Sequence, residues 1–367
     1  MIIQDTYPKK NSGFDYRLDF IRFISFLLVF ICHFVFNGGS GIQNSPNVWW
    51  NKEVIQRFSF FGREGVTLFF VLSGFLLGRL MLKEFLITTR ISVKKFFLRR
   101  VLRIWPLYFF FLFICFFINI WTENTGFTNQ ELVYLLTFTY NFGLILQNAG
   151  SSISSITWSL SIEEQIYLLL PLVSILRFRK RFVIEAFIFF LIGTTSLIIC
   201  DLGNLDSTYF TLSYFLPVSF GLFIAVYEDT IRERLINYKT VTFISLGFLW
   251  LYPFFYSDIK RLGVSTIIFY LTSFYFFCLL HITDKYLPSN QLVYALAKIG
   301  RVSYGCYLYH FIILFVFIHF EVLFNSEDGF SLVGVFLGFI STVIISFISY
   351  FNFELYFLKK KQKYTGI

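Results

Sequence analysis

The chain has 367 residues, of which 56% are hydrophobic and only 14% are charged, and its mean hydropathy is +0.68. Soluble globular proteins contain about 45–50% apolar and about 25% charged residues, so this chain has too little polar surface to enclose a water-soluble core. The composition therefore excludes a soluble enzyme, a nucleic-acid-binding module and a secreted disulfide scaffold. The net charge of +9 gathers in short clusters between apolar runs, which is typical of membrane-protein loops. We expect an all-α polytopic membrane protein.

Ten apolar runs reach or approach the ~20 residues that a helix needs to span a bilayer. In chain order they cover residues 18–36, 59–80, 104–120, 164–177, 182–200, 209–227, 240–256, 263–281, 303–324 and 331–352. We predict about ten transmembrane helices in a single domain, residues 1–367, with no fused soluble domain. The five cysteines lie inside or at the ends of apolar runs and lack CxxC spacing, so we expect neither a metal site nor a disulfide framework.

The distribution of Lys and Arg predicts the orientation. Basic residues cluster between the second and third runs, and again at 177–181 and 359–363, and the positive-inside rule places such clusters in the cytoplasm. The loops expected outside are poor in basic residues and cover 37–57, 121–130, 201–208 and 325–330. Loop 257–262, with Lys260 and Arg261, does not fit this pattern. Both termini are then cytoplasmic.

Residues 131–147 are apolar enough to form a further span. If they crossed the bilayer, the basic cluster at 177–181 would lie outside, so we predict a lateral or re-entrant element here. Irregular backbone at membrane depth is tolerated only where protein or a water-filled cavity satisfies it. We therefore expect this element to line a cavity on the outer side.

The first apolar run contains two ionisable residues, Arg22 and His33. Eleven residues at about 100° each leave about 20° after three turns, so both side chains share one helix face and lie about 16 Å apart along the axis. Arg22, near the cytoplasmic end, suits phosphate binding, and His33, near the outer end, suits a general base. We expect both to line one continuous cavity. A snorkelling arginine and a histidine bonded to a neighbouring helix explain the pair equally well.

Arg100 and Arg103 precede the third run and are three residues apart, so they share one side of a helix start. A partly buried phosphate contact explains Arg103 at least as well as an ordinary basic cluster does. In the second run, Ser73 and Gly74 are also explained by close helix packing.

The segment Trp158–Tyr167 opens the fourth span and carries two acids, Glu163 and Glu164, shortly after Trp158 and Ser159. Helix capping and the helix dipole explain one acid well. The functional alternative places one carboxylate, preferably Glu163, beside His33 to orient the imidazole.

In the ninth run, Ser303, Tyr307 and His310 form one polar stripe at i, i+4 and i+7. Interhelical hydrogen bonding is the favoured explanation for this stripe, and a role in a substrate cavity is the alternative.

Taken in order, these segments resemble the acyltransferase 3 family of integral membrane acyltransferases. The segments that carry the resemblance are Arg22 with His33, Gly65-Val66 to Ser73-Gly74-Phe75, Arg99–Tyr108, Trp158–Glu163, Ser303-Tyr304 to Tyr307–His310, and the tail Glu354–Lys359. The tail lacks the proline that usually follows this glutamate in the family.

The resemblance implies transfer of an acyl group, commonly acetyl, from acyl-CoA in the cytoplasm to a hydroxyl of a surface glycan or glycolipid. Acyl-CoA is then a co-substrate rather than a permanently bound cofactor, and the protein is a multi-pass protein of the cell membrane. The motif match gives His33 and Glu163 catalytic roles and gives donor contacts to Arg22, Arg100 and Arg103. We expect the substrate cavity to include Ser73, Trp158, Ser159, Glu164, Tyr307 and His310.

A polytopic exporter or flippase of a glycan or lipid has the same size and number of spans. Such transporters more often show two matching halves with interrupted segments, and the sequence shows no such repeat.

Overall fold

The computed structural model describes residues 15–37, 52–122, 128–150, 153–171, 181–203, 205–235, 273–274, 287–320, 324–325, 329–330 and 332–364. Nearly all of these residues are helical. Two strands of two residues each, β1 (Phe324–Asn325) and β2 (Gly329–Phe330), pair in an antiparallel manner. The predicted runs 240–256 and 263–281 lie outside the described residues, apart from residues 273–274.

Five helical segments of the described chain are long and apolar enough to cross a bilayer: Gly62–Thr88, Val93–Thr122, Phe182–Leu202, Thr211–Ile231 and Val333–Lys361. A sixth is added if the bent pair Gln291–Arg301 and Ser303–His319 counts as one span. The helical membrane-protein class is thus confirmed, whereas the count of ten helices and the cytoplasmic position of both termini stay predictions.

The described apolar runs coincide with long helices. Their bounds are α1 (Tyr16–Ile31), continued by the π-helix η1 (Cys32–Asn37), α2 (Lys52–Thr88), α3 (Val93–Thr122), α6 (Trp158–Leu169), α7 (Arg181–Leu202), α8 (Phe215–Leu235), α12 (Ser303–His319), α13 (Leu332–Ser349), the π-helix η7 (Tyr350–Glu354) and α14 (Leu355–Gln362). Short 3-10 turns precede α6 and α8: η2 (Ser155–Thr157), η4 (Ser207–Tyr209) and η5 (Thr211–Tyr214). The fourth element therefore begins at Trp158, six residues before the predicted run.

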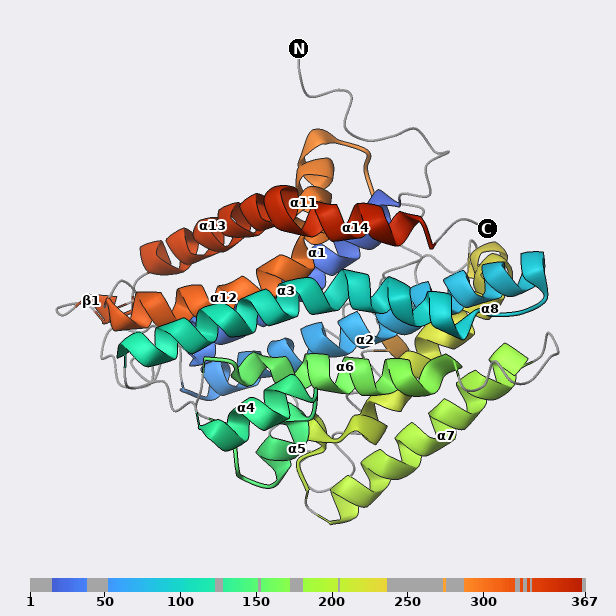
Figure 1. Ribbon diagram of the computed structural model, residues 1–367, viewed down its shortest axis with the longest axis horizontal. Helices are drawn as coiled ribbons and strands as arrows, with labels where there is room; N and C mark the ends of the chain where they lie inside the picture. Colours follow the sequence, from blue (N-terminus) through green and yellow to red (C-terminus); the bar gives the residue numbers. More distant parts are fainter. Residues whose placement is uncertain are drawn as a thin grey trace.

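Most helices run lengthwise through the molecule (Figure 1). Helix α2 packs against α1 and α8, α7 covers α8, and α12 packs against α13. The core between them is rich in fully buried aromatic side chains, including those of Phe26, Phe30, Phe75, Tyr108 and Phe111.

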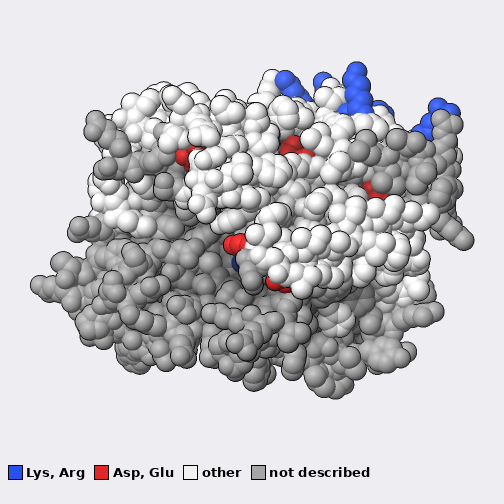
Figure 2. All heavy atoms as spheres, turned by 90° about the horizontal axis from the view of Figure 1, so that it is seen from below, with Lys and Arg blue, Asp and Glu red and all other residues white. Residues whose placement is uncertain are grey.

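The outward faces of several helices are apolar. Helix α3 exposes Phe113 and Phe117, α7 exposes Phe187, and α13 exposes Phe336. Soluble monomers rarely expose contiguous apolar faces of this kind, so these faces suit contact with lipid chains. In Figure 2 the described surface is mostly uncharged, and the Lys and Arg side chains gather along one edge.

A buried ion pair ties together the end of α2, the start of α3 and the end of α14. The Nη2 of Arg99 donates to Oε2 of Glu84 at 2.9 Å, and both side chains are at most 5% exposed. The Nη1 of Arg99 donates to the carbonyl of Tyr364 at 3.1 Å, and Oε1 of Glu84 accepts from the backbone N–H of Ser92 at 2.8 Å. Three chain segments thus share one buried charge pair, in which both Nη atoms of Arg99 are hydrogen-bonded.

Residues 131–147 do not form one continuous helix. They fold into α4 (Asn129–Leu136) and α5 (Tyr140–Ile145), separated by Phe138, which has a left-handed φ of 54°. Eight residues of α-helix extend only about 12 Å, so neither helix can cross a bilayer. The Tyr108 hydroxyl donates to the carbonyl of Leu135 at 2.8 Å and Nε2 of Gln165 donates to the carbonyl of Phe138 at 2.8 Å. The prediction that this segment is not a span is confirmed.

A helix that the hydropathy pattern did not predict, α11 (Gln291–Arg301), precedes α12 and meets it at 73°. Asn290 caps it by accepting the N–H of Val293 at 2.9 Å. It crosses α1 so closely that a Cβ on Gly300 would lie 1.7 Å from the carbonyl oxygen of Asp19. The absence of a side chain at Gly300 therefore sets the distance between α11 and α1.

Candidate active site

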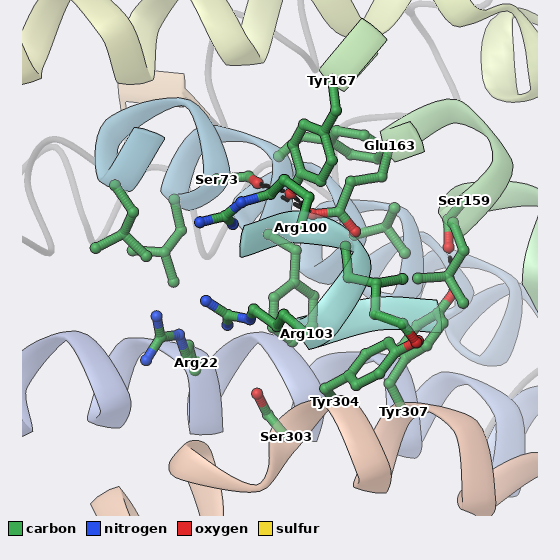
Figure 3. Close-up of a pocket in the computed structure, with 17 residues that line it drawn as sticks. Arg22, Ser73, Arg100, Arg103, Ser159, Glu163, Tyr167, Ser303, Tyr304 and Tyr307 are labelled. Atoms are coloured by element: carbon green, nitrogen blue, oxygen red, sulfur yellow. Dashed lines mark hydrogen bonds between the residues drawn. The ribbon is translucent and has the colours of Figure 1, made fainter. Parts of the chain in front are cut away.

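A cavity of about 110 Å³ lies between α1, α2, α3, α6 and α12. Polar and charged side chains from all five helices line it, together with apolar ones (Figure 3). The polar lining consists of Arg22, Ser73, Arg100, Arg103, Ser159, Glu163, Tyr167, Ser303, Tyr304 and Tyr307. The structure thus brings together the three arginines that the sequence assigned to donor binding and three of the six residues assigned to the substrate cavity.

Arg22, Arg100 and Arg103 direct their guanidinium groups toward one part of the cavity (Figure 3). Arg22 forms an ion pair with the buried carboxylate of Asp19, one turn earlier on α1. Arg100 is 8% exposed and lies 5.7 Å from the ring centre of Tyr167. Its buried Nε has no hydrogen-bond acceptor among the residues that the structure describes.

Arg103 has neither a hydrogen bond nor an ion pair with any residue in the described part of the chain. Guanidinium groups stay charged in proteins, and like charges repel strongly where water is scarce. Three converging guanidinium groups with one close carboxylate partner therefore form a site that suits an anion, and arginine is the preferred residue for phosphate.

Glu163 lies beside this cationic part of the cavity. Its Oε1 accepts a hydrogen bond from Ser73 at 3.0 Å and a second, short one from Tyr167, and the Ser73 and Tyr167 hydroxyls are 2.6 Å apart. The hydrogen bond from Ser73 to this carboxylate therefore connects α2 to α6.

The placement of Glu163 beside His33 is wrong. Helix α6 begins at Trp158, so Glu163 lies more than one turn inside it. There it lines the same cavity as Arg100. His33 instead contacts His310, with 2.8 Å between His33 Nδ1 and His310 Nε2.

The opposite end of the cavity is formed by Ser159 and Tyr307, whose hydroxyls are 2.7 Å apart. Tyr307 also donates to the carbonyl of Ile156 at 3.1 Å. The first turn of α6 is thereby fixed to α12.

His33 and His310 lie next to the Tyr307 end, although neither lines the cavity. The ring centres of Tyr307 and His310 are 5.7 Å apart, and His310 is fully buried whereas His33 is partly exposed. Of the expected pair, Arg22 lines this cavity and His33 does not. One continuous cavity lined by both residues stays a prediction.

Two further predicted cavity residues lie elsewhere. Trp158 packs edge-on against Tyr209, with ring centres 5.5 Å apart. Glu164 accepts a hydrogen bond at 3.2 Å from Nε1 of Trp105, which lies on the exposed face of α3. Both residues are neighbours of cavity residues in the sequence, but helix rotation turns them away.

Two polar lining residues, Tyr167 and Tyr304, had no assigned role in the sequence. Tyr167 stands four residues after Glu163 and thus shares its helix face, which is the signal that identifies it. The Tyr304 hydroxyl donates to the carbonyl of Ile104 at 2.9 Å and fixes α12 to α3.

Comparison with known proteins places the chain in a family. Residues 15–351 match the acyltransferase domain of the acyltransferase 3 family. The chain belongs to this family of acyltransferases.

Among curated proteins, O-acetyltransferase OatA of Staphylococcus aureus is 29% identical over 281 residues, which are 69% of this chain and 46% of that protein. An uncharacterized protein of Haemophilus influenzae is 31% identical over 146 residues, which are 36% of this chain and 59% of that protein. The chain thus matches about half the length of these relatives. No solved structure gives a significant match.

Proposed function

We propose that this protein is a multi-pass O-acyltransferase of the cell membrane. It takes an acyl group, with acetyl as the first choice, from cytoplasmic acyl-CoA and transfers it to a hydroxyl of a glycan or glycolipid on the other side. Family membership and the likeness to a protein named an O-acetyltransferase support the class of reaction. The observation that carries the choice of donor is the convergence of Arg22, Arg100 and Arg103 in one cavity.

Coenzyme A is a polyanion with a long, thin pantetheine arm, so it suits a cavity that is cationic at one end. In this proposal Arg100 and Arg103 hold the phosphates, because their guanidinium groups form no ion pair with a carboxylate of the described residues. The arm extends along the cavity toward Ser159 and Tyr307. A shift of the Tyr307 side chain brings the thioester within reach of His33.

In the transfer step, His33 takes the proton of the acceptor hydroxyl as its oxygen attacks the thioester carbonyl. A carbon–oxygen bond forms, the carbon–sulfur bond breaks, and the leaving thiolate takes the proton back from His33. The products are the ester and free coenzyme A, so atoms and charge balance without another reactant. Exclusion of bulk water protects the thioester from hydrolysis.

The proposal is tested with purified protein in liposomes that contain acetyl-CoA on one side and cell-surface glycans on the other. We expect free thiol to appear together with acetyl ester on the glycan, and both to be lost in His33→Ala. Movement of the glycan across the bilayer without release of thiol would contradict the proposal and support the exporter alternative.

A further inference from the structure

We propose that His310 is a positioning residue that holds His33 in the tautomer a general base requires. This inference rests on the proposed function, because it concerns how His33 becomes able to accept a proton. It replaces the predicted carboxylate partner of His33 with a second imidazole.

The hydrogen bonds of His310 determine which ring nitrogen carries a proton. Its Nδ1 lies 3.2 Å from the carbonyl oxygen of Cys306, and a carbonyl oxygen can only accept. Nδ1 of His310 therefore carries the hydrogen. In a neutral imidazole the other nitrogen, Nε2, is then an acceptor.

The partner of this acceptor is Nδ1 of His33, at 2.8 Å. Since Nε2 of His310 accepts, His33 must donate through Nδ1–H. A neutral His33 with its proton on Nδ1 has an unprotonated Nε2, which is the nitrogen that can take a proton from an acceptor hydroxyl. The chain of bonds from the Cys306 carbonyl through His310 thus leads to one tautomer of His33.

The surroundings favour this neutral pair. His310 is fully buried and packs edge-on against Phe26 and Phe311, at 6.1 Å between ring centres in each case. A charge without a counter-ion is costly among such apolar groups. The rings of His33 and His310 also stack, with centres 5.1 Å apart and an angle of 13° between planes.

The backbone of α1 changes form where His33 lies. The α-helix ends at Ile31, and Cys32–Asn37 form the π-helix η1. Such π-helical turns are rare in proteins, and those that occur are often found at functional sites. His33 is the second residue of η1 and contacts His310 of α12. The change of backbone form thus begins at the contact between the two histidines.

Two matched variants of His310 test the role of its acceptor nitrogen. In His310→Gln the side-chain oxygen can still accept from His33 Nδ1–H, whereas His310→Met has similar length but no strong acceptor. We expect His310→Met to lower kcat for acetyl transfer at least about tenfold, with KM for acetyl-CoA changed less than about twofold, and His310→Gln to keep kcat within about threefold of the wild type.

Wild-type kcat in His310→Met, or an equal loss in the Gln and Met variants, would overturn the inference while leaving the proposed function intact. If the wild-type protein consumes no acetyl-CoA, the proposed function and this inference fail together.

A measurement on the wild-type protein does not depend on the folding of any variant. In protein labelled with nitrogen-15 in its four histidines, we expect nuclear magnetic resonance to show the His33 proton on Nδ1 and an unprotonated Nε2. The His33→Ala variant identifies the signals. A His33 ring protonated on Nε2 alone would overturn the inference.

Discussion

Removal of the Arg103 side chain tests whether the cavity binds the phosphates of coenzyme A. Arg103 lines the cavity and has no hydrogen-bond or ion-pair partner among the described residues, so Arg103→Ala should change ligand binding and cost little fold stability. A hydrogen bond to a charged group contributes about 1.5–3 kcal/mol, and about 1.4 kcal/mol is tenfold in Kd. We therefore expect Arg103→Ala to weaken coenzyme A binding about 10–100-fold.

The binding is measured by calorimetry on detergent-purified protein at one fixed ionic strength. Arg79→Ala is the matched control, because Arg79 is also an arginine of the basic region but does not line the cavity and forms an ion pair of 3.2 Å with Glu228. We expect its Kd to stay within about twofold of the wild type, since Coulomb effects between exposed charges are screened. Equal Kd values for wild type and Arg103→Ala would refute the phosphate assignment.

Two further predictions concern the framework around the cavity. Glu84→Gln leaves the buried charge of Arg99 without its counter-ion, so we expect a loss of about 3 kcal/mol in stability and a lower thermal midpoint. Glu228→Gln, whose arginine partner is 45% exposed, should cost less than about 1 kcal/mol, and equal losses would contradict the role of burial. Gly300→Ala forces a Cβ to within 1.7 Å of the Asp19 carbonyl oxygen, so we expect it to lower the thermal midpoint, as overpacking typically does by about 1–3 kcal/mol. A higher midpoint would show that the gain in helix propensity of about 1 kcal/mol dominates and that α11 can move away from α1.

Much of the fold follows from hydropathy, because a bilayer requires long apolar helices. The runs 18–36, 59–80, 104–120 and 182–200, and residues 332–352 of the last run, lie within helices or helix pairs of the structure. Helix α11 escaped prediction because it has only 11 residues and is amphipathic, with Val293, Ala297 and Gly300 on its buried face and polar residues such as Lys298 elsewhere. The π-helix at Cys32–Asn37 escaped because no composition pattern distinguishes it from an α-helix.

The candidate site was predictable as far as it depends on spacing. Arg100 and Arg103 share one helix face at i and i+3, and the structure directs both into the cavity with Arg22. Their binding of a donor stays a prediction. The partner of His33 was not predictable, because its contact with His310 joins residues 277 positions apart.

Glu163 was expected beside His33, whereas in the structure its carboxylate accepts hydrogen bonds from Ser73 and Tyr167. Spacing along one helix does not specify which side chains of neighbouring helices lie at the same depth. The ion pair of Glu84 with Arg99 was not predicted, because it joins side chains of two different helices.

The most direct test of the account follows the acyl group itself. Surface glycans are analysed by mass spectrometry from cells that carry the wild-type protein, His33→Ala, or no copy of the protein. We predict that the wild type alone adds mass equal to acetyl groups, that alkali removes this mass, and that purified His33→Ala still binds coenzyme A with wild-type affinity. Glycans from His33→Ala cells with the full wild-type acetyl content would contradict the account.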